Sequence, residues 1–140
     1  MSGIDFLDSN VVIYLFDPVD SRRRAIAEDI VYGAHRDGSA VISFQVVQET
    51  LNVLTRKLRP PMKPDDAAQL LHTVLAPLWR VHPSPALYQQ ALDVQERYRL
   101  SFYDSMIVAA ALEAACGRIL SEDLQHGQRI GSLQIENPFR

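Results

Sequence analysis

The chain has 140 residues, of which 47% are hydrophobic and 22% are charged, a balance that excludes intrinsic disorder and is typical of one globular domain. The single cysteine, Cys116, cannot form an intrachain disulfide, which suits a reducing cytosol, and no apolar run approaches the roughly 18–20 residues that cross a bilayer. The net charge of −3 argues weakly against a nucleic-acid-binding protein, because such proteins are usually basic. We therefore expect a single domain over residues 1–140 that is cytoplasmic and independent of membranes.

Short apolar runs alternate with amphipathic stretches along the chain. The apolar runs predict strands at residues 4–7, 40–43, 80–82, 118–120 and 133–135. Helical spacing and capping residues predict helices at about 10–16, 20–36, 46–58, 64–79, 85–98 and 103–115. Gly117 is expected at the C′ position that terminates the last helix, and the prolines at 60, 61 and 64 predict a turn between two helices. The alternation predicts a mainly parallel sheet of about five strands covered by helices on both faces, an α/β/α sandwich.

Four acidic residues follow strands or begin helices in this arrangement. Asp8 follows the first strand, and Asp123 follows the strand at 118–120. Glu49 lies in the first two turns of the helix after the second strand, and Asp104 opens the last helix. Because ligands of parallel sheets bind at the carboxyl ends of the strands, we expect these side chains to meet at one edge. Carboxylates crowded within about 6 Å repel one another, and an all-oxygen site that relieves this repulsion suits Mg²⁺ or Mn²⁺.

Helix capping offers a purely structural role for most of these acids. Asp8 is placed to cap the helix that follows it, and Ser101–Asp104 fits the capping-box pattern. A residue within 121–123 is placed to cap a short helix after it. Capping does not explain Glu49, nor why the acids share one edge of the sheet, so both interpretations stay open.

The sequence lacks the motifs of other proteins that bind metals or transfer phosphate. The absence of G-x-x-x-x-G-K-[ST] excludes a P-loop NTPase, and the histidines and the single cysteine show no zinc-binding spacing. A phosphatase with an aspartyl-phosphate intermediate would have Asp-x-Asp after its first strand, where this chain has Asp8-Ser9-Asn10. Metal-assisted phosphoryl transfer remains favoured, because the cation activates water and neutralises charge on phosphate oxygens.

Four segments resemble, in order and spacing, the motifs of PIN-domain ribonucleases, and above all those of the VapC toxins of bacterial toxin–antitoxin pairs. They are Phe6-Leu-Asp-Ser-Asn10, Ser43-Phe-Gln-Val-Val-Gln-Glu49, Leu100-Ser-Phe-Tyr-Asp-Ser-Met-Ile-Val-Ala-Ala-Ala111 and Ile119-Leu-Ser-Glu-Asp-Leu-Gln-His-Gly-Gln128. The resemblance implies that the catalytic, metal-binding acids are Asp8, Glu49, Asp104 and Asp123. It also implies supporting polar roles for Asn10 and Ser121, and it leaves open whether Glu122 reaches the metal.

The resemblance further implies the function of a Mg²⁺- or Mn²⁺-dependent endoribonuclease and toxin. In such enzymes, a metal-activated water attacks an RNA phosphodiester in line and leaves 5′-phosphate and 3′-hydroxyl ends. The family's toxins usually form homodimers and are inhibited by a cognate antitoxin that lies along the active-site groove. Two alternatives stay open: an RNA-processing PIN nuclease without an antitoxin, and an inactive PIN-like module that binds partners. All four acid positions are filled, which favours the active enzyme.

Two groups of residues are candidates for contact with RNA or an antitoxin. The apolar group comprises Tyr14, Phe16 and the helix at 65–79. Trp79 at the end of this helix, and the leucines before it, are expected to be buried in the core instead. The basic residues that are candidates for contacts with RNA phosphates or antitoxin acids are Arg22, Arg23 and Arg56. A solvated helix face is the alternative role for these arginines.

Overall fold

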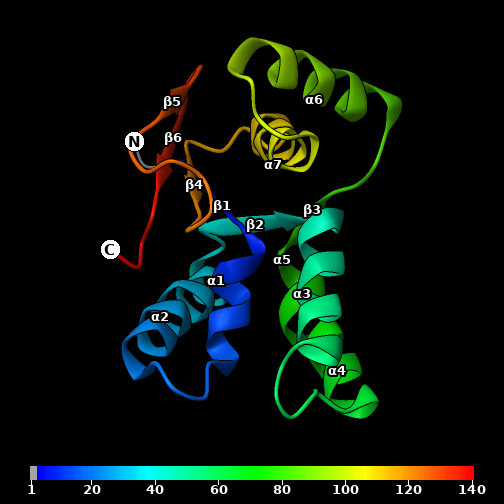
Figure 1. Ribbon diagram of the computed structural model, residues 1–140, viewed down its shortest axis with the longest axis vertical. Coiled ribbons are helices and arrows are strands. Elements are labelled where there is room, and N and C mark those ends of the chain that lie inside the picture. The colour runs from blue at the N-terminus through cyan, green and yellow to red at the C-terminus, as the bar shows by residue number, and fades with distance from the viewer. Residues whose placement is uncertain (1–2) are drawn as a thin grey trace.

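Strands and helices alternate along the chain, which the computed structural model describes over residues 3–140 (Figure 1). The strands are β1 (Asp5–Leu7), β2 (Ala40–Ser43), β3 (Trp79–Val81), β4 (Arg118–Leu120), β5 (Arg129–Ile130) and β6 (Leu133–Glu136). The α-helices are α1 (Ser9–Ile13), α2 (Ser21–Asp37), α3 (Phe44–Arg56), α4 (Pro64–Leu70), α5 (Ala76–Leu78), α6 (Pro85–Tyr98) and α7 (Phe102–Glu113). A 3₁₀ turn, η1 (Tyr14–Phe16), extends α1, and a π-helical turn, η2 (Leu71–Leu75), joins α4 to α5. Within residues 3–140, no helix has the length and apolar character needed to cross a membrane.

The strands form one sheet in the order β3-β2-β1-β4-β6-β5, parallel except for β5, which runs antiparallel to β6. From β1 the chain proceeds outward through β2 to β3, then returns through α6 and α7 to β4 on the other side of β1. The strand order therefore reverses between β1 and β4. Figure 1 shows α1 to α5 on one side of the sheet and α6 and α7 on the other. This arrangement confirms the predicted α/β/α sandwich with a mainly parallel sheet.

The sheet has six strands, where the sequence predicted about five. The additional strand, β5, has two residues and pairs with β6 through Arg129 and Ile130. It lies between Gly127 and Gly131, which both have positive φ and allow the chain to turn on either side of it. A strand of two residues is too short to show an apolar period, which is why the sequence did not reveal it.

The core lies on both faces of the central strands. Phe6 and Leu7 are neighbours in β1 and point to opposite faces, yet both are fully buried, as expected for a parallel sheet covered twice. Helix α7 is buried continuously from Ser105 to Ala111. Figure 1 shows α7 between α6 and the sheet. A helix enclosed in this way must be apolar all round, and its small alanines allow its neighbours to approach closely.

Two predicted helix ends differ from the structure. Helix α7 ends at Glu113, and Ala115, with φ of 57°, adopts the left-handed conformation that was expected at Gly117. The Gly117 N–H instead donates to the Ile4 carbonyl at 3.0 Å, where β1 and β4 begin. Trp79 begins β3 rather than ending a helix, because the chain leaves the helical conformation after α5. Its side chain is half-buried, and its indole N–H donates to the carbonyl of Val81 at 2.9 Å.

We expect Ala110→Leu to lower the free energy of unfolding by about 1–3 kcal/mol, because Ala110 is 1% exposed and extra methyl groups would force α6 and the sheet apart. Chemical denaturation measures the change. Ala86→Leu, which adds the same atoms to an exposed position of α6, is the control and should change stability by about 0.5 kcal/mol or less. Wild-type stability in the Ala110→Leu protein would show that α7 is not enclosed.

Candidate functional site

Asp8 lies directly after β1, at the point where the strand order reverses. Its backbone N–H donates to the Leu120 carbonyl of β4 at 3.0 Å. Its carboxylate is nearly enclosed, with Oδ1 accepting from the Ser9 backbone N–H at 2.8 Å and Oδ2 accepting from the Ser121 hydroxyl at 2.7 Å. The bond to Ser9 confirms Asp8 as the N-cap of α1. Ligands of open parallel sheets bind at such a switch point, so this cap also occupies a binding position.

Ser121 organises the turn that follows β4. Its hydroxyl oxygen accepts the backbone N–H groups of Asp123 at 3.1 Å and of Leu124 at 3.3 Å, while the same hydroxyl donates to Asp8. The short helix expected after residues 121–123 is not formed, because residues 122–124 make a bend that these two bonds to Ser121 close. The carboxylate of Asp123 is not required for these bonds.

Asn10 connects α1 to the same turn. Its side-chain N–H donates to Asp123 Oδ2 at 3.2 Å, and its Oδ1 accepts the Glu122 backbone N–H at 3.2 Å. An asparagine can make both bonds at once, because its amide carries a donor and an acceptor. Asn10 therefore holds the carboxylate of Asp123 beside α1.

Gln45 joins the other two acid positions. It lies one turn before Glu49 in α3 and donates to Glu49 Oε2 at 3.3 Å and to the Tyr103 carbonyl at 3.1 Å. Asp104 is the next residue along α7, and its backbone N–H donates to the Ser101 hydroxyl at 3.1 Å, which confirms Ser101 as the N-cap. Gln45 thus fixes α3 against the beginning of α7. No sequence pattern marks this role of Gln45, because the contact depends on how two helices pack.

Negative charge accumulates around Asp8. Burial is the largest cause that raises the pKa of this carboxyl from 3.8 to about 6, the bonds from Ser121 and Ser9 oppose the rise, and the charges of Glu49 and Asp123 add to it. The structure therefore places Glu49 and Asp123 where their charges act on Asp8, while Asp104 lies at the start of the helix that Gln45 ties to Glu49.

The donor chemistry of this site suits a divalent cation. Carboxylate oxygens are the ligands that Mg²⁺ and Mn²⁺ prefer, and a cation would relieve the repulsion that raises the pKa of Asp8. Across residues 3–140, however, no three acidic, histidine or cysteine side chains are already arranged as a ligand set. Binding would therefore require the carboxylates to converge further.

Glu122 belongs to a separate network. Its carboxylate accepts the Tyr14 hydroxyl and forms an ion pair with Arg23 at 3.5 Å. The guanidinium carbon of Arg23 lies 4.9 Å from the centre of the Tyr14 ring, and Arg23 also donates to the Tyr14 hydroxyl at 3.3 Å. Burial first, and then the bond to Glu122, raises the pKa of Tyr14 to about 12, so the hydroxyl keeps its proton at neutral pH. Glu122 thus has partners of its own beside the site.

The candidate arginines differ in their surroundings. Arg22 donates to the backbone carbonyls of Phe139 at 2.8 Å and of Arg140 at 2.7 Å, so it holds the end of the chain against α2. Arg23 is engaged with Glu122, as described above. Arg56 is exposed at the end of α3. Of these three, Arg56 has the most accessible surroundings for an external anion.

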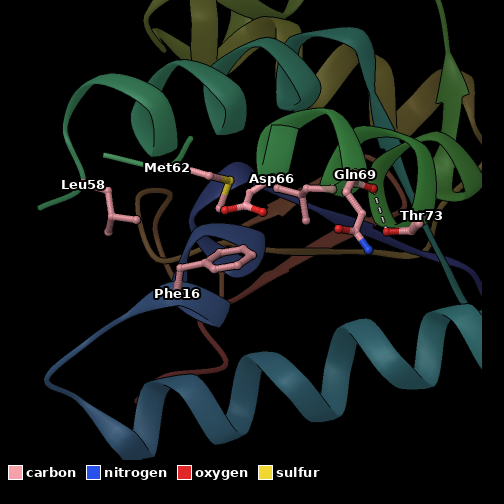
Figure 2. Close-up of a pocket in the computed structure, with 7 residues that line it drawn as sticks. Phe16, Leu58, Met62, Asp66, Gln69 and Thr73 are labelled. Atoms are coloured by element: carbon pink, nitrogen blue, oxygen red, sulfur yellow. Dashed lines mark hydrogen bonds between the residues drawn. The ribbon is translucent and has the colours of Figure 1, made fainter. Parts of the chain in front are cut away.

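A mainly apolar pocket of about 470 Å³ opens between η1 and α4 (Figure 2). In Figure 2, Phe16 faces Met62 and Asp66 across the pocket, and Gln69 and Thr73 continue the wall formed by α4 and η2. The complete lining consists of Phe16, Leu58, Met62, Asp66, Gln69, Leu70 and Thr73. Phe16, which the sequence offered as partner-binding surface, is therefore part of an open hydrophobic recess.

In metal-free buffer, we expect Asp8→Asn to gain stability relative to the wild type as the pH rises from about 4 to about 7. The pKa of Asp8 is higher in the folded than in the unfolded chain, so its protonated form stabilises the fold. The wild type loses this contribution to the free energy of unfolding as the pH rises through about 6. A shift from 3.8 to about 6 corresponds to about 3 kcal/mol. Urea denaturation of both proteins across this pH range measures the difference, and a pH-independent difference would show that Asp8 is well solvated.

The comparisons with known proteins agree with this architecture. The PIN domain family matches residues 6–129. No curated protein sequence matches the chain significantly. Among solved structures, the chain is similar to VapC20 of Mycobacterium tuberculosis, described as a sarcin–ricin loop cleaving toxin, with 22% identity, a TM-score of 0.63, and coverage of 85% of this chain and 91% of that one.

Two toxin–antitoxin assemblies are also similar in structure. One is a complex from Klebsiella pneumoniae, with 16% identity, a TM-score of 0.69, and coverage of 96% of this chain and 97% of that one. The other is VapBC2 of Rickettsia felis bound to a DNA fragment from its promoter, with 16% identity, a TM-score of 0.61, and coverage of 96% and 98%. At these identities the structures establish a shared fold. Because the family match spans most of the sequence and every candidate acid, the chain belongs to the PIN domain family.

Proposed function

We propose that this chain is a metal-dependent endoribonuclease and the toxin of a toxin–antitoxin pair. The observation that carries the proposal is the buried Asp8 carboxylate at the switch point of the sheet, with its pKa raised in part by Glu49 and Asp123. Ionising a buried carboxyl beside other negative charges lowers the stability of the fold, and groups with a pKa shifted in this way are typical of functional sites. Membership of the PIN domain family and a fold shared with toxins support the same assignment.

In this proposal, Asp8, Glu49, Asp104 and Asp123 hold the cation. A bound Mg²⁺ or Mn²⁺ would activate water for in-line attack on an RNA phosphodiester and neutralise charge on the phosphate. The chain itself orients the ligands and supplies their charge. With a pKa of about 6, Asp8 is mainly ionised at neutral pH and is protonated in mild acid, so proton and cation compete for it.

The surrounding polar residues restrict how these carboxylates move. Ser121 orients Asp8, Asn10 orients Asp123, and Gln45 orients Glu49, each through the hydrogen bonds described above. Such outer partners typically change metal affinity or activity by about 10–100-fold when removed. We therefore assign positioning roles to Asn10 and Ser121.

The pocket that contains Phe16 is the proposed binding surface for the antitoxin. It is mainly apolar, with Asp66 in its lining, and the exposed basic residues Arg56, Lys57, Arg59 and Lys63 lie on the segment that contributes Leu58 and Met62 to its wall. An antitoxin segment with an apolar side chain and neighbouring acidic residues would match this surface. Two further predictions accompany this proposal: a homodimer, which the family resemblance implies, and a cytoplasmic location, which the single cysteine suggests.

We expect Asp104→Asn to reduce RNA cleavage by roughly 100-fold or more, because it removes a negative charge that the cation needs. The Ser101 cap of α7 bonds to the backbone of residue 104, so the fold should be unaffected. Cleavage of a labelled RNA with Mn²⁺ present measures the effect, and EDTA should abolish wild-type activity until the metal is restored.

The exposed Asp93 in α6 provides the matched control, Asp93→Asn, since its carboxylate accepts from Gln89 of the same helix and takes part in none of the hydrogen bonds of the site. This variant should cleave RNA like the wild type. Wild-type cleavage by Asp104→Asn would instead show that Asp104 serves only the helix terminus.

We expect Phe16→Asp to weaken antitoxin binding by about 10-fold or more, because it removes the aromatic wall of the pocket and adds a second carboxylate beside Asp66, while RNA cleavage persists. Calorimetric titration with the protein encoded beside this one measures binding. Tyr32→Asp, at a position of α2 that is 57% exposed and outside the pocket, is the control. Equal affinity of the wild type and Phe16→Asp would place the antitoxin elsewhere.

A further inference from the structure

A second pocket, of about 330 Å³, lies between α3, α6 and α7. Its lining consists of Phe44, Gln45, Gln48, Tyr88, Phe102, Tyr103 and Met106, and as the structure describes it this lining is uncharged. The Tyr88 and Phe102 rings are parallel within 3°, with centroids 6.5 Å apart, and Tyr103 meets Phe102 edge-on at 5.5 Å. We call this surface the aromatic pocket.

Two aromatic side chains of the aromatic pocket are exposed to solvent. Tyr103 is 68% exposed and Tyr88 is 41% exposed, on neighbouring helices whose other faces contribute to the core. Large aromatic side chains grouped at the surface mark binding sites more often than scattered apolar residues do. The absence of charge in the described lining favours a neutral, flat group over a phosphate.

The aromatic pocket adjoins the proposed active site. Gln45 belongs to its wall and donates to Glu49 and to the Tyr103 carbonyl, and Asp104 directly follows Tyr103. Two of the proposed metal-binding acids therefore border residues of the pocket. A nucleotide next to a phosphodiester at the acids would have its base within reach of these rings.

Gln45 also carries an unsatisfied polar atom. Its side chain is buried, its N–H group is used by Glu49 and Tyr103, and its carbonyl oxygen Oε1 has no hydrogen-bond partner in the described part of the chain. An unpaired acceptor of this kind is costly. Because this oxygen is covered, a ligand that enters the pocket would reach it when the side chains above it move apart, and an N–H presented to it there would remove that cost.

We propose that the aromatic pocket binds one unpaired base of the RNA substrate beside the cleaved phosphodiester. The base stacks on the exposed aromatic rings, and its N–H edge pairs with the amides of Gln45 and Gln48. Unpaired RNA bases are recognised in this way, by stacking on aromatic side chains and by hydrogen bonds to their edges. This inference rests on the proposed ribonuclease function and adds a specificity-determining subsite to it.

The test uses single-stranded RNAs that each carry one abasic nucleotide, placed in turn at the positions flanking the cleavage site. For the wild type, we expect one abasic position to lower kcat/KM by roughly 5–100-fold, the range that loss of one stacked base produces. Tyr103→Ala should cleave intact RNA more slowly than the wild type does. In this variant, the abasic nucleotide at the sensitive position should lower kcat/KM only slightly further, so most of the penalty is lost. Tyr103→Phe should keep the penalty, because it keeps the ring.

Leu92→Ala is the matched control, since Leu92 is 49% exposed on α6 and lies outside the pocket lining. It should behave like the wild type on every RNA. A binding measurement complements cleavage: 2-aminopurine at the sensitive position should lose fluorescence on binding to Asp8→Asn protein and should keep it when Tyr103→Ala is added.

Four outcomes would overturn the subsite. If the wild type cleaves RNA with metal but no abasic position matters, or if Tyr103→Ala keeps the full penalty, the subsite is wrong while the proposed function stands. If sedimentation shows that Tyr103→Ala converts a dimer into a monomer, the pocket is occupied by a second copy of the chain. If the wild type cleaves no RNA, the proposed function fails and the subsite fails with it.

Discussion

The hydrogen bond from the Ser121 hydroxyl to the Asp8 carboxylate joins the ends of β1 and β4 where the strand order reverses. Water is largely excluded from the Asp8 carboxylate. Its negative charge is therefore stabilised by the hydrogen bonds from Ser121 and the Ser9 N–H, and by a cation where one binds. The turn carrying Asp123 depends on the same serine, which accepts two backbone N–H groups of that turn. Fold and candidate site therefore share one small polar cluster.

Helix capping and the proposed cation binding are compatible at these positions. Asp8 caps α1 and also lies at the switch point, Ser101 caps α7 beside Asp104, and Ser121 closes the bend that carries Asp123. A serine cap satisfies exposed backbone donors without using a carboxylate. The capping interpretation of Asp8 was therefore right about local structure, and it does not compete with a role in cation binding.

Much of the fold was accessible from the sequence, because buried strands and capped helices leave local signals. The end of α2 at Asp37, followed by left-handed Gly38, is such a signal, and the parallel order of the sheet follows from the alternation. Contacts between segments far apart in the sequence could not be predicted. The Tyr14–Glu122–Arg23 network and the bridge made by Gln45 depend on tertiary packing, so sequence spacing left Glu122 open and gave Gln45 no role. The metal-binding assignment of Asp8, Glu49, Asp104 and Asp123 stays a prediction.

A Mn²⁺ titration followed by electron paramagnetic resonance measures whether these carboxylates act as one cation site. Bound Mn²⁺ loses its free-ion signal, so the titration reports binding without RNA or an antitoxin. We expect saturable Mn²⁺ binding by the wild type at neutral pH, weaker binding at about pH 5, where Asp8 is mainly protonated, and at least about tenfold weaker binding by Asp8→Asn. Equal binding by the wild type and Asp8→Asn, or no binding by either, would contradict one cation site.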